Sequence, residues 1–250
     1  MKRALDVFRR TLQRFLELEG FDRAMALAGQ AFAALLPLLI VIGAVSPTRG
    51  EDAASAIIDR LELTGQSAAV VKQAVAQPAE IQNGISALSF FILVVSALAF
   101  TRALQRLYVR AWRLEKIGVR GNAWGLEWLL VVAVYISLQP VIVGLFDGAL
   151  ATGVSLAFSC AVWLFTPWLL IGRQLPWQRL LPQALLTAFG LTALGIASAI
   201  YMPRAVASAA AQFGFIGVAF ALLSWLFASA LVLVVTAALG STLVEPASDA

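Results

Sequence analysis

Four arginines at helical spacing are the residues of this chain best suited to bind a ligand by charge. They are Arg102, Arg106, Arg110 and Arg113. Intervals of four, four and three residues place the guanidinium groups on one face of a helix. A basic cluster directly beside an apolar segment attracts anionic lipid headgroups, at about 1 kcal/mol per charge. We therefore predict contact with anionic lipid here, although the same charges could serve only to orient the chain in a membrane.

Two glutamines and two prolines inside uncharged segments form a second candidate site. They are Gln30, Pro37, Gln139 and Pro140. A proline frees the carbonyl one turn earlier, and a buried amide costs free energy unless it has a partner. We predict that these four residues line a central substrate cavity. The alternative is that each glutamine bonds to a neighbouring helix and the prolines only kink the helices for packing.

Residues for catalysis or metal binding are nearly absent. The chain has no histidine, a single cysteine, Cys160, and no cluster of acidic residues within its apolar segments. Histidine is the commonest general base and metal ligand, and a carboxylate-only metal site would need such a cluster. We therefore expect no enzymatic activity, no metal and no cofactor.

The composition predicts a membrane protein. Of 250 residues, 61% are hydrophobic and 13% charged, with a mean hydropathy of +0.87. A soluble domain is about 45–50% apolar and about 25% charged, so this chain has too little polar surface for water. Although the net charge is +4, the basic residues border apolar segments, which favours a membrane surface over nucleic acid as the partner.

Six apolar segments are long enough to cross a bilayer, which takes roughly 20 residues. They are residues 24–46, 81–101, 124–146, 149–172, 180–202 and 213–240. Uncharged backbone in hydrocarbon must pair within its own element, so each segment should be a helix. The predicted fold is an all-α bundle of six transmembrane helices in a single membrane domain, 1–250.

The positive charges set the orientation of this bundle. Fourteen of the 18 Lys and Arg residues fall in 1–23, in 102–123 and just after the fourth segment. Lys and Arg accumulate on the cytoplasmic side, so both termini and the basic segment 102–123 should be cytoplasmic. Residues 47–80 and 203–212 should then lie outside, with 47–80 forming an outer helical loop.

Residues 1–23 should contain an amphipathic cytoplasmic helix. Leu5, Phe8, Leu12, Phe15 and Leu16 recur at helical spacing among arginines. This pattern is typical of a helix at headgroup depth, and equally of a helix packed on the end of the bundle.

Three further expectations concern contacts. Glu127 should pair with an arginine of the 102–113 face, and Tyr108 and Trp112 should lie at the membrane interface. Small residues of the last two segments predict close helix packing, within one chain or between copies in a homo-oligomer.

Four motifs, in order, resemble one known family. They are Ala31–Leu39 with its Pro-Leu-Leu ending, Ser96–Tyr108, Leu181–Ala184 and Phe213–Gly217 followed by Leu223–Leu226. On these motifs the chain is similar to the YihY / virulence factor BrkB family of bacterial inner-membrane proteins, once mislabelled ribonuclease BN. Gln105 stands where the family has Asn, and Phe213 where it has Tyr.

The resemblance implies a multi-pass protein of the bacterial plasma membrane that acts in the cell envelope. It implies no catalytic residues. We expect a transporter of a lipid or other amphiphile, with anionic lipids as cytoplasmic partners. The alternative is an envelope scaffold that works through helix and lipid contacts.

Overall fold

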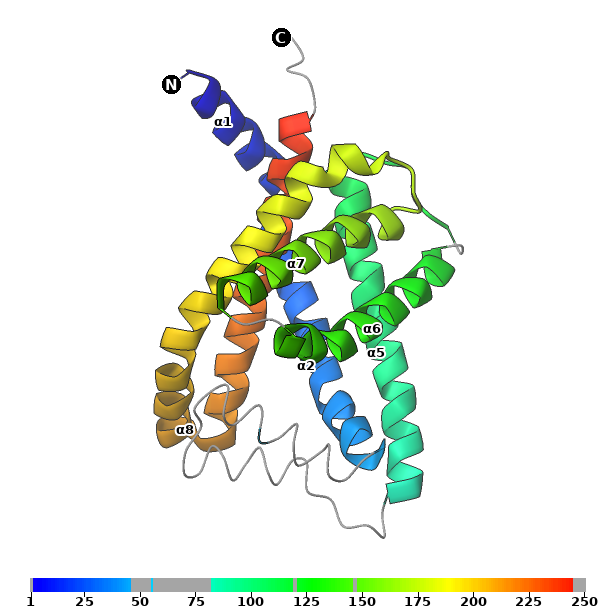
Figure 1. The fold of residues 1–250 in the computed structure, drawn as a ribbon, viewed down its shortest axis with the longest axis vertical. Coiled ribbons are helices and arrows are strands. Elements are labelled where there is room, and N and C mark those ends of the chain that lie inside the picture. Colours follow the sequence, from blue (N-terminus) through cyan, green and yellow to red (C-terminus); the bar gives the residue numbers. More distant parts are fainter. Residues whose placement is uncertain (1, 46–54, 56–81, 119–120, 146–147, 245–250) are drawn as a thin grey trace. The chain divides into compact units, whose positions relative to one another are not determined.

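The computed structural model describes residues 2–45, 55, 82–118, 121–145 and 148–244 (Figure 1). Its helices are α1 (Lys2–Glu17), α2 (Gly20–Val45), α5 (Gln82–Ala111), α6 (Gly121–Leu145), α7 (Gly148–Leu170) and α8 (Trp177–Val244). Two helices joined at Gly214 make up α8, and we call them its arms. These ranges contain no strand, so the predicted all-α class is confirmed for them. The predicted outer loop, 47–80, lies outside the described residues except at residue 55.

The six predicted apolar segments fall, in their described parts, on α2, α5, α6, α7 and the two arms of α8. Three described helices are long and apolar enough to cross a membrane. They are Phe90–Ala111, Trp177–Gly214 and Ile216–Val244. The chain is therefore a membrane protein, while six crossings and cytoplasmic termini stay predictions.

The link between the last two predicted segments is itself helical. Residues 203–212 continue the first arm of α8 as helix, and the chain turns only at Gly214. The stretch after Pro203 is rich in alanine, the residue with the highest helix propensity. Met202, Val206 and Ala210 are buried against Val218 of the second arm, and this packing stabilises the extra turns.

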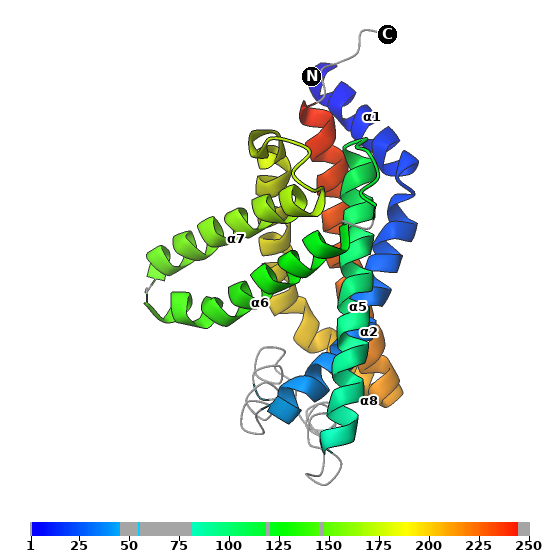
Figure 2. The same cartoon turned by 90° about the vertical axis from the view of Figure 1, so that its right-hand side faces the viewer.

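The chain divides into two compact units. The first comprises residues 1–26, 100–192 and 230–250, and the second residues 27–99 and 193–229. In the first unit, α6 and α7 lie side by side as an antiparallel hairpin (Figure 2). The core of the first unit includes Leu104, Leu107 and Val234, all at most 1% exposed. A single membrane domain stays a prediction.

Two glycines shape the turn of α8 in the second unit for different reasons. Gly214 has φ 59° and ψ −136°, a region that only glycine enters without strain. Gly217 lies so close to the other arm that an added Cβ would come within 2.0 Å of the Ala209 carbonyl oxygen. One glycine therefore reverses the chain, and the other lets the two arms touch.

Candidate functional site

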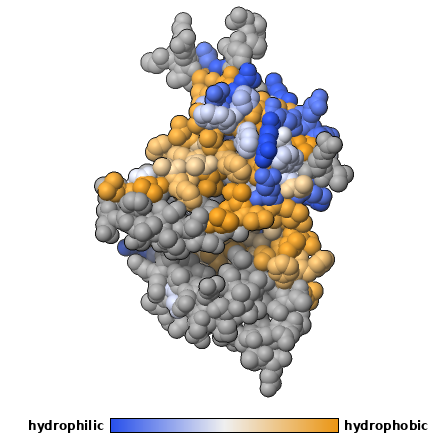
Figure 3. All heavy atoms as spheres, turned by 45° about the vertical axis from the view of Figure 1, so that its right-hand side comes forward, coloured by the Kyte–Doolittle hydropathy of each residue, from blue (hydrophilic) through white to orange (hydrophobic). Residues whose placement is uncertain are grey.

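The four predicted arginines lie at the C-terminal end of α5, in the first unit. Arg102, Arg106 and Arg110 are on the helix, Arg113 follows its end, and all four are exposed. Hydrophilic side chains gather in one region of the face drawn in Figure 3, bordered by apolar surface. The α5 arginines thus stand at the end of a helix that is apolar enough to cross a membrane.

Three of these arginines are joined to neighbouring segments. Arg102 Nε donates to Asn122 Oδ1 at the start of α6, at 3.1 Å. Arg113 Nη2 lies 3.2 Å from Glu17 Oε2, and Arg110 Nη1 lies 4.0 Å from Glu19 Oε2. Because these ion pairs are exposed, each contributes about 1 kcal/mol or less to stability. They position the guanidinium groups without withdrawing them from solvent.

A fifth arginine joins this face from α2. The side chain of Arg23 is only 16% exposed, and its Nε donates to the Leu18 carbonyl oxygen. Burial lowers the pKa of its guanidinium below the usual value, the like charge of Arg110 acts in the same direction, Glu19 opposes, and Arg106 lowers it further. We call Arg23, Arg106 and Arg110 the basic cluster. Arg23 and Arg110 lie 3.9 and 4.0 Å from the same oxygen, Glu19 Oε2. Neighbouring guanidinium groups suit a phosphate, which each can bind through two parallel hydrogen bonds.

From the sequence, Arg23 is only one of the charges of residues 1–23 that set the orientation of the chain in the membrane. It lies more than 80 positions before its partners on α5, so no local spacing could bring it into the cluster.

Buried hydrogen bonds between side chains connect the helices of the first unit. Trp112 Nε1 donates to Gln183 Oε1 at 2.6 Å. Thr187 and Thr236 hydroxyls lie 2.8 Å apart between the two arms of α8. Gln105 Nε2 donates to the Gly121 carbonyl oxygen at 2.7 Å. A low-dielectric interior strengthens such bonds and makes each unpaired group costly.

The predicted interfacial position of two aromatic residues is wrong. Tyr108 is 1% exposed and Trp112 is 8% exposed within the first unit. Helical spacing predicted the face that they share, but their neighbours come from distant parts of the chain. The amphipathic rings therefore pack inside the protein, where the indole N–H bonds to Gln183.

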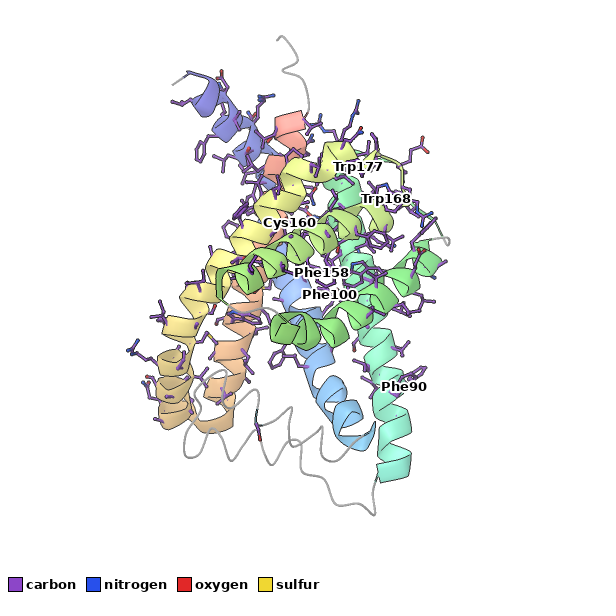
Figure 4. All side chains as sticks on the ribbon, in the orientation of Figure 1. Phe90, Phe100, Phe158, Cys160, Trp168 and Trp177 are labelled. Carbon is purple, nitrogen blue, oxygen red and sulfur yellow. The ribbon has the colours of Figure 1, made fainter. Side chains whose placement is uncertain are left out.

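Glu127 has a partner other than the one expected. It lies 3.3 Å from Arg173 Nη2, so pairing with the 102–113 face is wrong. The Arg173 guanidinium also lies 4.7 Å from the ring centre of Trp124 and 4.8 Å from that of Trp168, at the C-terminal end of α7 (Figure 4). Stacking on an aromatic ring attracts a cation, so Arg173 fastens the α6–α7 hairpin near its open end.

The predicted cavity of glutamines and prolines is only partly described. Gln30 is half-buried in the second unit, and its Oε1 is buried without a hydrogen-bond partner among the described residues. The side chains of Pro37, Gln139 and Pro140 lie outside the described part. This substrate site stays a prediction.

The described residues hold no group of three or more His, Cys, Asp or Glu that could bind a metal ion.

Comparison with known proteins identifies one family. The family model described as virulence factor BrkB matches residues 11–249, nearly the whole chain. The search of curated proteins and the search of solved structures found no match.

Proposed function

Since the chain belongs to the virulence factor BrkB family, we propose that it is a multi-pass protein of the bacterial plasma membrane that moves a lipid or other amphiphile of the cell envelope. It is an integral membrane protein with three long apolar helices among its described residues. The proposed role is non-catalytic and needs no cofactor.

The basic cluster carries this proposal. Arg106 and Arg110 lie toward the end of the apolar helix α5, Arg23 and Arg110 share Glu19 as a partner, and Arg23 is largely buried. A charge held at the end of a membrane helix lies at headgroup depth, where each adds about 1 kcal/mol to the attraction of anionic lipid. Such a cluster would select a phosphate headgroup on the cytoplasmic side.

Helix α1 supports a position at the membrane surface. Arg14 and Phe15 of this helix and Leu18, just after its end, are buried in the first unit, and the Thr11 hydroxyl lies 3.0 Å from that of Thr242. A second stripe is apolar but exposed, and it consists of Leu5, Phe8, Leu12 and Leu16. One face of α1 thus packs on the protein while another offers apolar side chains to lipid. A helix at headgroup depth and a helix packed on the end of the bundle, the two alternatives from the sequence, are therefore compatible.

Lipid titration by native mass spectrometry tests headgroup binding. Replacing both Arg106 and Arg110 by Gln should weaken phosphatidylglycerol binding by about 2 kcal/mol, roughly 30-fold. Binding of zwitterionic phosphatidylcholine should not change. Arg179→Gln is the control, because Arg179 is an exposed arginine of the first unit outside the cluster. Equal phosphatidylglycerol affinity in parent and double variant would reduce these charges to an orientation signal.

Movement of lipid needs its own assay. Proteoliposomes that contain the parent should move a fluorescent phospholipid between leaflets faster than protein-free vesicles do, and the double variant should be slower. Parent vesicles no faster than empty ones would favour the envelope scaffold. The buried hydrogen bonds of the first unit are the observation that favours this second candidate.

A further inference from the structure

The parts of the two α8 arms that belong to the second unit line an open groove. Its volume is about 720 Å³, within the roughly 300–1,000 Å³ typical of small-molecule sites. Small residues of both arms form part of the lining, including Ala197, Ala205 and Ala221. Large side chains border it, and Tyr201 and Phe220 are 70% and 67% exposed. Small residues between large ones leave a slot for a narrow, flexible ligand.

The polar atoms of this slot are mostly bonded to the protein. Trp225 Nε1 donates to Ser198 Oγ at 2.8 Å, between the arms. Ser198 Oγ donates to the Leu194 carbonyl oxygen at 2.6 Å, and Ser224 Oγ to that of Phe220 at 2.8 Å. An occupant therefore finds apolar surface and few free hydrogen-bonding groups, which suits a hydrocarbon chain.

One charge lies beside the slot. Arg204 is exposed, one turn from Tyr201 and next to Ala205 in sequence. From Arg204 to Leu194, which also lines the slot, the arm rises by about 15 Å, half of a hydrocarbon core of about 30 Å. This part of the slot is thus as long as one leaflet is thick, with a cation beside it, and the slot continues past Arg204 along Ala209 and Phe213. Both arms are apolar enough to cross a membrane, so lipid is the solvent around them.

We propose that this slot binds one acyl chain of an anionic phospholipid, whose phosphate lies at Arg204. The proposal deepens the proposed function, because it names a second place where the chain holds its lipid. It does not require that the lipid be moved.

Retained lipid tests the slot. The protein is purified in detergent with equal amounts of dioleoyl phosphatidylglycerol and dioleoyl phosphatidylcholine, and bound lipid is counted by native mass spectrometry. Ala197→Phe should fill the slot and lower at least fivefold the phospholipid retained by the slot, while the lipid at the basic cluster stays. Ala199→Phe is the matched control, because it adds the same ring to an exposed alanine two residues along the arm that does not line the slot. Ala221→Leu repeats the test from the other arm, with Ala219→Leu as its control.

The headgroup and the location have separate readouts. Arg204→Gln should lower the preference for phosphatidylglycerol over phosphatidylcholine about fivefold. A phospholipid with a photoreactive group at the end of one acyl chain should crosslink near Leu194 and Ala228. Unchanged retention in both slot-filling variants, or crosslinking of a second protein copy across the slot, would overturn the proposal. If the slot retains lipid but the protein does not move lipid between leaflets, only the proposed function is overturned. If the protein moves lipid but the slot retains none, only the slot proposal is overturned.

Discussion

At the scale of single residues, the bond between Trp112 and Gln183 offers the clearest test of the first unit. Gln183 is 1% exposed, and its Oε1 accepts the indole N–H. Trp112→Phe removes this donor and leaves a buried amide oxygen unpaired, so we expect a loss of about 1–3 kcal/mol in unfolding free energy. Unfolding by SDS in mixed micelles, followed by circular dichroism, measures the change.

Trp177→Phe serves as its control, because Trp177 is half exposed at the first residue of α8. The same midpoint in the Trp112 and Trp177 variants would contradict a stabilising role for the buried bond.

Local spacing predicts the arginine face of α5 because all of its members belong to one helix. It cannot predict that Arg23 joins this face, or that Glu127 meets Arg173 across 46 positions, because these contacts depend on packing between helices. For the same reason helical periodicity shows that Trp112 shares a face with Tyr108 but not whether that face meets lipid or protein. The burial of both rings is a property of tertiary structure.

At the scale of elements, apolar length predicts the helices better than it predicts their ends. Pro203 and Arg204 mark the end of an apolar segment, yet the helix continues to Gly214. Packing of Val206 and Ala210 against Val218 outweighs the proline, which removes one backbone donor. The turn is decided by the left-handed φ of Gly214, which hydropathy does not reveal.

Alanine substitution of two glycines on the first arm should therefore have opposite effects. Gly214→Ala forces a side chain into a glycine-only conformation and should destabilise the protein by about 1–3 kcal/mol. Gly195→Ala lies within the helix with open space around its Cβ position, and should stabilise it by about 0.5–1 kcal/mol. SDS unfolding midpoints of the two variants, compared with the parent, measure both signs. A midpoint for Gly214→Ala at or above that of the parent would show that the turn tolerates a side chain.

At the scale of the whole molecule, orientation in the membrane is the property that the charges predict most directly. In a Cys160→Ser background, we expect a membrane-impermeant thiol reagent added to intact cells to label Ser208→Cys and not Arg110→Cys. The reason is that most Lys and Arg residues fall on the side of Arg110. Labelling of Arg110→Cys from outside would reverse the orientation, and labelling of neither site before the cells are opened would place 203–212 on the cytoplasmic side.

The first arm of α8 also bears on hydrophobic mismatch. Its 38 residues, Trp177–Gly214, measure about 57 Å along the axis, against a hydrocarbon core of about 30 Å. Transmembrane helices tilt by at most about 40°, and at that angle about 26 residues span the core. An arm that crosses the bilayer therefore keeps about 12 residues outside the hydrocarbon even at the steepest tilt. Thickening the bilayer would draw these residues inward without stretching the helix, so an arm of this length can match membranes of quite different thickness.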